Sequence, residues 1–572
     1  MTEPDARRFE WQLTAVAAGC VVVAVLALTV FPGVLADSPP GIPTGAILGS
    51  SAGVLFGFAA LCTAGVWLHH RWFFTERQAL RRALGPPDDW LNLPEWRRTA
   101  SPDAIRGEAA RFWGRPDATA DQAGWVVGEV ISGRWPMREK LLRAPYPRSV
   151  LVLGPQGSGK SQYAIPIILD LPAAAVITST KSELLDATAP WRARLGPVSV
   201  FDPLGVTGGR HNVAFDPVTG CHDGERAEVA AAAMIRGASL GGTLRDGFWA
   251  DAGRQILRCY LLAAALAGGS SFEVQHWSHH PDDPEPLRIL EAHPGRVPEG
   301  WISNLRARLD TSRRQRDGYF GTVIATTEYL GHPGGAAAVR AARDTRGGPF
   351  DMARFLAEHA TLYVVGDATK QGLAAMMTAL TELIAYDARE TAKTTKRLPE
   401  PLGMVLDEVA NLTPVDLPRW VTEFRGWGIV PFAFVQSRAQ LDTVWGHDDA
   451  DVIFDNMITR VILRDLAAAG FLDDLSRLAG ERQLRRPATT GSRWGRGEDV
   501  PAGTERLIPP HVIRSLPMWH ALILGPPAQP AVVAFEPGYE RLARQRIGTP
   551  YRARWPRWWR HPITATRTAL TR

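Results

Sequence analysis

The sequence predicts an α/β fold built on a parallel β-sheet and preceded by a membrane hairpin. Three observations support this prediction. Short apolar runs recur between residues 149 and 435 and alternate with helical patterns, as in parallel α/β sheets. Polar residues follow the ends of these runs, where such sheets bind ligands. Two long uncharged stretches also lie near the N-terminus.

The size and composition of the chain set the first limits. A chain of 572 residues is too long for a single core, so several structural units are expected. Its formal net charge of +5 is mildly basic and does not by itself indicate an anionic partner. The four cysteines form no CxxC pair, and no histidine cluster has metal-ligand spacing. Neither a disulfide framework nor a zinc site is indicated.

The N-terminal region, residues 1–84, is predicted to anchor the chain in a membrane. Residues 13–35 and 45–68 contain no charged side chain, and each stretch is long enough to cross a bilayer as a helix. A short, turn-rich connector joins them. Basic residues flank the pair and are absent from the connector, so the positive-inside rule places both termini in the cytoplasm. A cleaved signal peptide is the alternative for the first stretch.

The segment GPQGSGKS follows the apolar run 149–154 and matches the phosphate-binding P-loop pattern. In this pattern backbone N–H groups wrap the phosphates, Lys160 reaches the β- and γ-phosphate oxygens and Ser161 binds Mg²⁺. The predicted nucleotide-binding residues are Gly154, Pro155, Gln156, Gly157, Ser158, Gly159, Lys160 and Ser161. Pro166 predicts a kink or a tightened turn in the helix that follows.

A pair of acids completes the predicted nucleotide site. The apolar run 402–406 ends in Asp407 and Glu408. Asp407 is predicted to complete the Mg²⁺ shell, and Glu408 to polarise the attacking water. Acids that merely cap a following helix are the alternative. With the P-loop upstream, the pair indicates ATP hydrolysis.

Two more polar residues are candidate catalytic groups. The apolar run 429–435 ends at Gln436, which is predicted to lie beside the γ-phosphate and report hydrolysis. Arg425 is a candidate arginine finger that acts on a neighbouring subunit's nucleotide. Arg438 and Arg460 are rivals for this role. The alternatives are a solvated glutamine at a strand end and an arginine on a surface helix.

Further strands of the same sheet are expected within 174–180, 197–203 and 360–367. Along the chain the motifs follow in this order: the two N-terminal spans, GPQGSGKS, STKSELLDAT (179–188), VFDPLG (200–205), FW (248–249), LDEVANL (406–412) and QSRAQL (436–441). This order resembles the TraG/TraD class of type IV coupling proteins, the membrane ATPases of conjugative DNA transfer. STKSELLDAT is the most specific of these motifs.

The resemblance implies a RecA-like motor domain that forms a hexameric ring below the membrane hairpin. It also implies ATP and Mg²⁺ as cofactors and a small all-α domain inserted in the motor. The expected limits are 85–222 and 346–540 for the motor and 223–345 for the insert, where Ala- and Leu-rich helical patterns replace the strand rhythm. Lys181 is expected near the nucleotide-side loops, in contact with either DNA or phosphate.

The function implied is that of an ATPase in the cytoplasmic (inner) membrane. It would bring a relaxase-linked single DNA strand to a secretion channel and help to pump it. One alternative is a receptor that feeds protein effectors to a secretion system. Another is a double-strand DNA translocase of the FtsK/HerA kind. A nonhydrolytic scaffold is a third alternative, and the intact Lys160, Asp407 and Glu408 argue against it.

The C-terminal tail, residues 541–572, holds nine arginines and no acid, with tryptophans at positions 555, 558 and 559. Arginine interleaved with aromatic rings suits nucleic acid, through phosphate contacts and base stacking. The same composition suits an anionic membrane surface. A solvated tail is the third interpretation, and the sequence leaves all three open.

Overall fold

The computed structural model of the protein describes residues 76–84, 90–132, 140–241, 247–344, 351–367, 371–486, 500–525 and 529–546. The predicted membrane spans, 13–35 and 45–68, lie outside the described residues, as does the tail beyond residue 546. Within the described residues no helix combines the length and the apolar character needed to cross a membrane.

The chain divides into two compact units, Met1–Gly85 and Pro86–Arg572. In the first unit the structure describes helix α3 (Glu76–Ala83), whose last turn carries Arg81 and Arg82. Basic side chains at this end of a helix are favoured by the helix dipole. The second unit contains the sheet and every nucleotide-binding motif predicted from the sequence.

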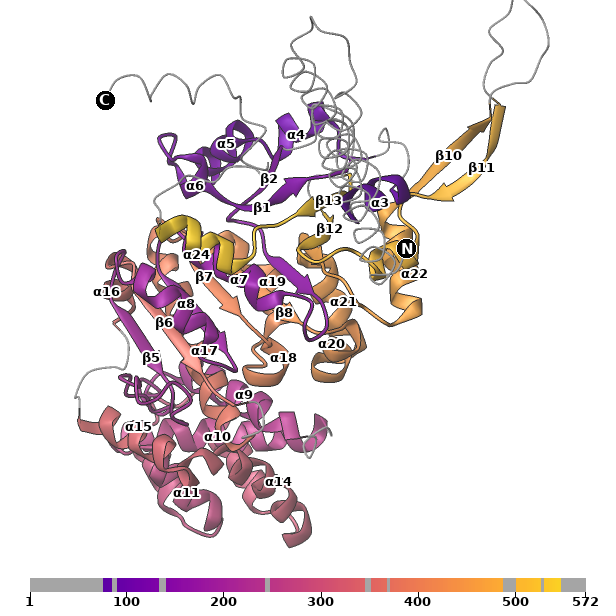
Figure 1. Ribbon diagram of the computed structural model, residues 1–572. Coiled ribbons are helices and arrows are strands. Elements are labelled where there is room, and N and C mark those ends of the chain that lie inside the picture. Colours follow the sequence, from indigo (N-terminus) through magenta and orange to yellow (C-terminus); the bar gives the residue numbers. More distant parts are fainter. Residues whose placement is uncertain are drawn as a thin grey trace, which may run out of the picture. The chain divides into compact units, whose positions relative to one another are not determined.

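A mixed, eleven-stranded sheet forms the centre of the second unit (Figure 1). The strand order across it is β2-β1-β13-β12-β9-β3-β8-β7-β4-β6-β5. These strands are β1 (Gly124–Val130), β2 (Leu141–Pro145), β3 (Val150–Leu153), β4 (Ala175–Ser179), β5 (Val198–Phe201), β6 (Thr361–Val365), β7 (Leu402–Leu406), β8 (Ile429–Val435), β9 (Thr459–Ile462), β12 (His520–Leu524) and β13 (Ala531–Ala534).

The sheet is parallel in one half and antiparallel in the other. The strands from β9 to β5 run parallel, as predicted. Strands β2, β1, β13 and β12 pair antiparallel, so a purely parallel sheet is the wrong description of this half. The physical reason is the length of the connections. Ten residues separate β1 from β2 in the sequence and six separate β12 from β13. Parallel strands need a crossover of about a dozen residues or more, whereas shorter connections join antiparallel strands.

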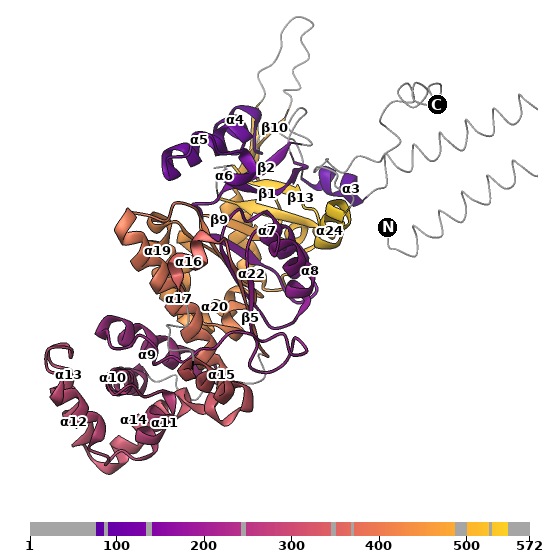
Figure 2. The same ribbon diagram turned by 90° about the vertical axis from the view of Figure 1, so that its left-hand side faces the viewer.

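Helices cover both faces of the sheet (Figure 2). On one face lie α7 (Lys160–Asp170), α8 (Glu183–Arg192) and α24 (Gly538–Arg546), and on the other α16 (Met352–Ala357), α17 (Ala374–Thr395) and α19 (Leu417–Trp427). Alternate residues of β3, Val150 and Val152, join the core beneath α7, as the two-residue period of a strand requires. Helix α7 continues through Pro166 to Asp170, so the proline does not end it.

The described residues between β5 and β6 form no strand, and their regular structure is helical. The helices are α9 (Gly224–Ala238), α10 (Gly247–Leu266), α11 (Ser271–His279), α12 (Glu285–Ala292), α13 (Trp301–Leu309), α14 (Arg313–Thr326) and α15 (Pro333–Asp344), followed by α16. In Figure 1 α9 to α15 gather beyond the carboxyl ends of the parallel strands. Helices α9 to α15 lie within the expected insert, 223–345, whose limits stay a prediction.

A buried carboxylate links the inserted helices to α19. Glu382 of α17 accepts hydrogen bonds from Arg236 of α9 (2.8 Å) and from Trp420 Nε1 of α19 (3.2 Å). The backbone N–H of Asp416, just before α19, also donates to Glu382. Burial raises the pKa of Glu382, and Arg236 opposes this rise. Helix α19, which carries Arg425, is thereby joined to the insert through one side chain.

Smaller elements complete the second unit. Before β1 lie α4 (Leu93–Thr99), α5 (Pro102–Trp113) and α6 (Ala120–Ala123), and after β7 lie α18 (Val409–Leu412), α20 (Arg438–Trp445), α21 (His447–Asn456), α22 (Ala469–Ala479) and α23 (Pro510–Arg514). Strands β10 (Glu481–Arg486) and β11 (Val500–Arg506) form a separate antiparallel pair that projects from the main sheet (Figure 1).

Candidate nucleotide-binding site

The P-loop lies between β3 and α7, the strand–loop–helix context that its motif requires. Gly157 and Gly159 have positive φ angles of 82° and 99°, which glycine adopts without a steric penalty. A Cβ on Gly154 would lie 2.4 Å from Ser158 Oγ, so the loop has no room for a side chain there. Ser158 Oγ is itself buried without a hydrogen-bond partner.

Lys160 lies over this loop. Its Nζ donates hydrogen bonds to the carbonyl oxygens of Gly154 (2.8 Å) and Pro155 (3.1 Å). Burial lowers the pKa of Lys160, and the nearby Asp407 and Glu408 raise it again. The positive charge is thus held between the loop and the two acids.

The acid pair follows β7 and is held by hydroxyl and amide groups. Ser179 Oγ donates to Asp407 Oδ2 at 3.3 Å. Glu408 accepts from Gln436 Nε2 (3.3 Å) and from Thr180 Oγ1 (3.5 Å). Burial, reinforced by Glu408, raises the pKa of Asp407 to about 7, and Lys160 and Ser179 oppose this rise without cancelling it. Glu408 has a φ of 52°, a left-handed conformation that is uncommon outside glycine and recurs at functional sites.

The strand order explains why these residues converge. Strand β8 lies between β3 and β7, with Val435 paired to Leu153 and Ala433 paired to Leu406. Gln436 therefore emerges between the P-loop and the acid pair, and its place beside a γ-phosphate stays a prediction. The structure brings Lys160, Asp407, Glu408 and Gln436 together, while their catalytic roles stay predictions.

Ser179 and Thr180 are site residues to which the sequence assigned no role. Both belong to STKSELLDAT, where Ser179 ends β4 and Thr180 follows it directly, and β4 is the next strand beyond β7. Their role could have been predicted from the sequence, because two hydroxyl side chains stand at the end of a predicted strand, where ligands of parallel sheets bind. Lys181, the third residue of the motif, is exposed, and its N–H donates to Ser179 Oγ (3.3 Å).

The three candidate arginines lie in different surroundings. Arg425 is in the last turn of α19, just before β8 begins, and so at the edge of the sheet opposite the P-loop. Its side chain is 53% exposed, and its ion-pair partner Glu108 is 4.0 Å away. Arg438 bonds to carboxylates of its own region, and Arg460 donates to backbone carbonyl oxygens. Within one chain none of the three joins the P-loop cluster.

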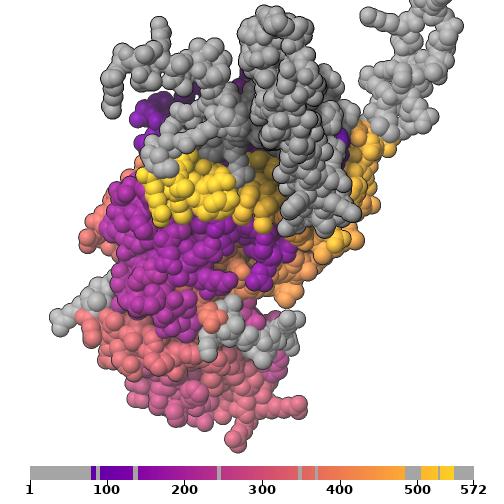
Figure 3. Space-filling model, in the orientation of Figure 1, coloured from indigo at the N-terminus to yellow at the C-terminus, as the bar shows by residue number. Residues whose placement is uncertain are grey.

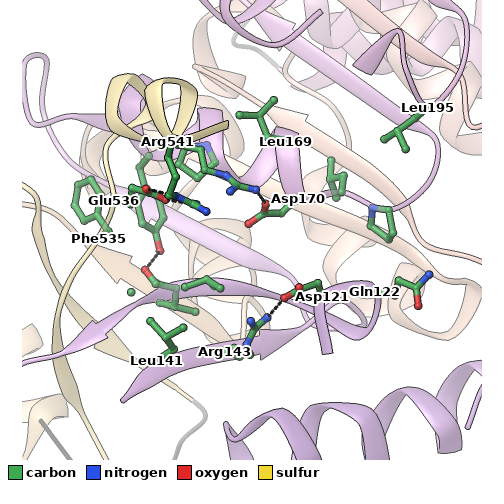
Figure 4. A pocket seen from close by; sticks show the side chains of 18 residues that line it. Asp121, Gln122, Leu141, Arg143, Leu169, Asp170, Leu195, Phe535, Glu536 and Arg541 are labelled. Atoms are coloured by element: carbon green, nitrogen blue, oxygen red, sulfur yellow. Dashed lines mark hydrogen bonds and ion pairs between the residues drawn. The ribbon is translucent and has the colours of Figure 1, made fainter. Parts of the chain in front are cut away.

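A separate cavity of about 760 Å³ lies beside the far end of α7 and contains no P-loop residue. Figure 4 shows Arg541 of α24 directed at Asp170, and Arg143 directed at Asp121. The remaining ion pair of its lining joins Arg544 to Glu536 at 2.7 Å. Because each of these acids has an arginine partner, the lining offers no excess charge for binding phosphate.

The chain is similar to known proteins in part of its sequence and in its fold. A family model described as "TraM recognition site of TraD and TraG" matches residues 401–518. No curated protein sequence matches the chain. The solved structure of the unbound bacterial conjugative coupling protein TrwBdeltaN70 has a TM-score of 0.54 at 19% identity, covering 73% of this chain and 89% of that one.

Two nucleotide complexes of the same protein match similarly. TrwB with ADP and Mg²⁺ has a TM-score of 0.52 at 19% identity, over 73% of this chain and 89% of that one. TrwB with the ATP analogue ADPNP has a TM-score of 0.50 at 20% identity, over 72% and 88%. At these identities the likeness shows a shared fold.

The fold and the loop define an α/β protein with a P-loop. Residues 401–518 match the TraD and TraG family model, and the fold around them is similar to that of a conjugative coupling protein. The resemblance to type IV coupling proteins of the TraG/TraD family is therefore confirmed.

Proposed function

We propose that this chain is a membrane-anchored ATPase that couples a relaxase-linked DNA strand to a type IV secretion channel and drives conjugative transfer by ATP hydrolysis. The observation that carries the proposal is the convergence of Lys160, Asp407 and Glu408 at one edge of a fold shared with TrwB. TrwB itself has been solved with ADP and Mg²⁺.

The residues present fit a Mg²⁺–nucleotide. The loop has two glycines in left-handed conformations and a buried, unpartnered Ser158 hydroxyl, as expected where backbone amides and hydroxyls receive phosphate. Ser161 and Asp407 offer the oxygen ligands that Mg²⁺ prefers. When bound, Mg²⁺ supplies positive charge against the phosphate oxygens.

Three side chains of the site have separate proposed roles in hydrolysis. Lys160 would turn from the loop carbonyls to the terminal phosphates. Glu408 would orient the attacking water and accept its proton, because its carboxylate is already held by Gln436 and Thr180. Gln436 contacts Glu408 directly, so a change at the γ-phosphate would reach β8 and α20 through it.

Location, assembly and partners belong to the same proposal. The uncharged stretches 13–35 and 45–68 support two membrane spans in the cytoplasmic (inner) membrane, with both termini cytoplasmic. The position of Arg425 on an exposed helix, away from its own P-loop, supports a ring in which each subunit completes its neighbour's site; a homo-hexamer is proposed. The description of the matched family names TraM recognition, which supports a protein partner for residues 401–518, alongside relaxase, DNA and channel proteins.

ATP hydrolysis by the purified full-length protein tests this proposal. Turnover is measured without nucleic acid, with single-stranded DNA and with duplex DNA, and single-stranded DNA is expected to stimulate most. Lys160→Ala should abolish the stimulated turnover, and Glu408→Gln should lower it about 10²- to 10⁴-fold while nucleotide still binds. Unchanged turnover in both variants would refute a P-loop motor, and preferential stimulation by duplex DNA would favour a double-strand translocase.

A further inference from the structure

Aromatic side chains gather on the flank of the P-loop opposite the acid pair. In the sheet β8 and β7 lie on one side of β3, whereas β9, β12 and β13 lie on the other. Trp519 precedes β12, Phe535 follows β13 and Tyr539 begins α24, all at the edge that carries the P-loop. The loop therefore has carboxylates on one side and aromatic rings on the other.

Trp519 is held directly against the P-loop. Its φ of 63° is a left-handed conformation, which is rare for a bulky side chain. Its carbonyl oxygen accepts a hydrogen bond from Phe535 N (2.9 Å), which fixes this backbone. A Cβ on Gly159, the last glycine of the loop, would lie 3.0 Å from the Trp519 ring. Strained residues of this kind cluster at functional sites.

Tyr539 extends the aromatic cluster to the surface. Its ring lies 5.8 Å from that of Trp519, edge to face, and is part of a residue that is 51% exposed. Its backbone N–H donates to Gln162 Oε1 (3.0 Å) in the first turn of α7. Figure 3 shows α24, in yellow, lying directly against the purple surface that contains α7. Tyr163 and Phe535 bury the inner end of the cluster, and Tyr539 leaves its outer end accessible.

We propose that Trp519 and Tyr539 form the stacking surface for the base of the bound nucleotide. The proposal rests on the proposed function, because it requires phosphates in the P-loop. With the terminal phosphate directed at Glu408, the nucleoside leaves the loop on the opposite flank, at the first turn of α7. Stacking on an aromatic ring needs only the π-face of a base, so adenine and guanine nucleotides are both ligands.

Binding of ADP, GDP and pyrophosphate, each with Mg²⁺, tests the role of Tyr539 by calorimetric titration of the full-length protein. Tyr539→Ala should weaken ADP and GDP about 5- to 50-fold and leave pyrophosphate unchanged, because only the base contact is lost. Tyr539→Phe keeps the ring and should bind all three normally. Phe248→Ala is the matched control, since Phe248 of α10 is also 51% exposed, and it should bind like the wild type.

Two results would overturn the stacking role. An equal loss of ADP and pyrophosphate binding in Tyr539→Ala would show that the ring only supports the P-loop. Unchanged ADP binding would place the base elsewhere. A wild-type protein that binds neither ADP nor pyrophosphate would instead contradict the proposed function itself, which separates the two failures.

Discussion

The two halves of the sheet are built differently and contribute differently to the molecule. In the parallel half polar side chains meet at one edge, where the strands end: Ser179 at the end of β4, Asp407 after β7 and Gln436 after β8. The antiparallel half places large aromatic side chains around the start of α7, such as Trp125 on β1 and Phe535 after β13. The chemistry thus depends on strand ends, whereas the antiparallel half supplies packing and the aromatic flank.

This comparison predicts that changes on the parallel side alter turnover without altering stability, and Arg425 should show the largest effect. If Arg425 acts as proposed, Arg425→Ala should lower the ATP hydrolysis of assembled protein about 10³-fold or more, because the transition state would lose a cation supplied by the neighbouring subunit. The side chain is 53% exposed, so the free energy of unfolding should stay within about 0.5 kcal/mol of the wild type. Steady-state turnover and thermal unfolding measure the two quantities.

Two controls separate a trans-acting role from a general defect. Mixing Arg425→Ala with Lys160→Ala subunits should restore part of the activity, since a mixed ring contains sites with both residues intact. Arg419→Ala removes a comparably exposed arginine from the same helix and should keep normal turnover. An equal loss in Arg419→Ala would assign the effect to the helix rather than to Arg425.

The antiparallel side should show the reverse pattern at Trp125. Its ring is 1% exposed and packs edge-on against Tyr163 (6.1 Å) and Phe432 (5.8 Å). Trp125→Ala should lower the free energy of unfolding by about 3–5 kcal/mol, because it leaves a large cavity, while folded protein keeps its affinity for ADP. The denaturation midpoint and ADP titration are the measurements. A loss of ADP affinity without a change in the denaturation midpoint would contradict the assignment of packing to the antiparallel half.

Asp407 belongs to both sides of the comparison, because the burial that places it in the proposed Mg²⁺ site costs stability. Its pKa is raised from 3.8 to about 7, chiefly by burial. Below about pH 4 the carboxyl is protonated in folded and unfolded protein alike, and as the pH rises to about 7 only the unfolded chain ionises freely. The free energy of unfolding therefore falls over this range, and the loss persists at higher pH.

Removing that charge should stabilise the protein at high pH only. In Mg²⁺-free buffer, Asp407→Asn should raise the free energy of unfolding by about 1–4 kcal/mol at pH 8 and leave it nearly unchanged at pH 4. Urea unfolding at both pH values measures this difference. Asp448→Asn, at an exposed acid in the first turn of α21, should give no stabilisation at pH 8, because the charge there is favoured by the helix dipole. A stabilisation of the same size at both pH values would point to packing instead of charge.

Local motifs predicted most of the parallel half of the sheet, together with the loop and the acid pair at its edge. Strands β4, β5 and β6 lie within the predicted runs, and the P-loop and the acid pair follow strands as expected. Such motifs are readable because loop, helix and charge are consecutive in the chain. Strands β1, β2, β9, β12 and β13 were missed. Strand β9 is only four residues long and contains an arginine, and β1 contains two glycines and pairs with β13, which is distant in the sequence.

Long-range packing explains why the remaining contacts around the P-loop could not be predicted from the sequence. Nothing near Trp519 or Tyr539 in the sequence signals that their rings lie beside Gly159 and the first turn of α7. The motif that contains Ser179 and Thr180 is recognisable in the sequence. Its contact with the acid pair after β7 is not, because β4 and β7 are adjacent only in the folded sheet. In the proposed ring, the choice among Arg425, Arg438 and Arg460 depends on a neighbouring subunit, which the sequence of one chain does not display.

The position of β13 has a consequence for biosynthesis. Among the described strands β13 alone joins β1 to β12, so it bridges the early hairpin β1–β2 and the rest of the sheet. The ribosome makes β1 and β2 before the P-loop and makes β13 after every other described strand of the sheet. Until residues 531–534 emerge, the nascent chain carries an open strand edge, the kind of edge on which aggregation begins. Completion of the sheet therefore waits for the synthesis of its last described strand.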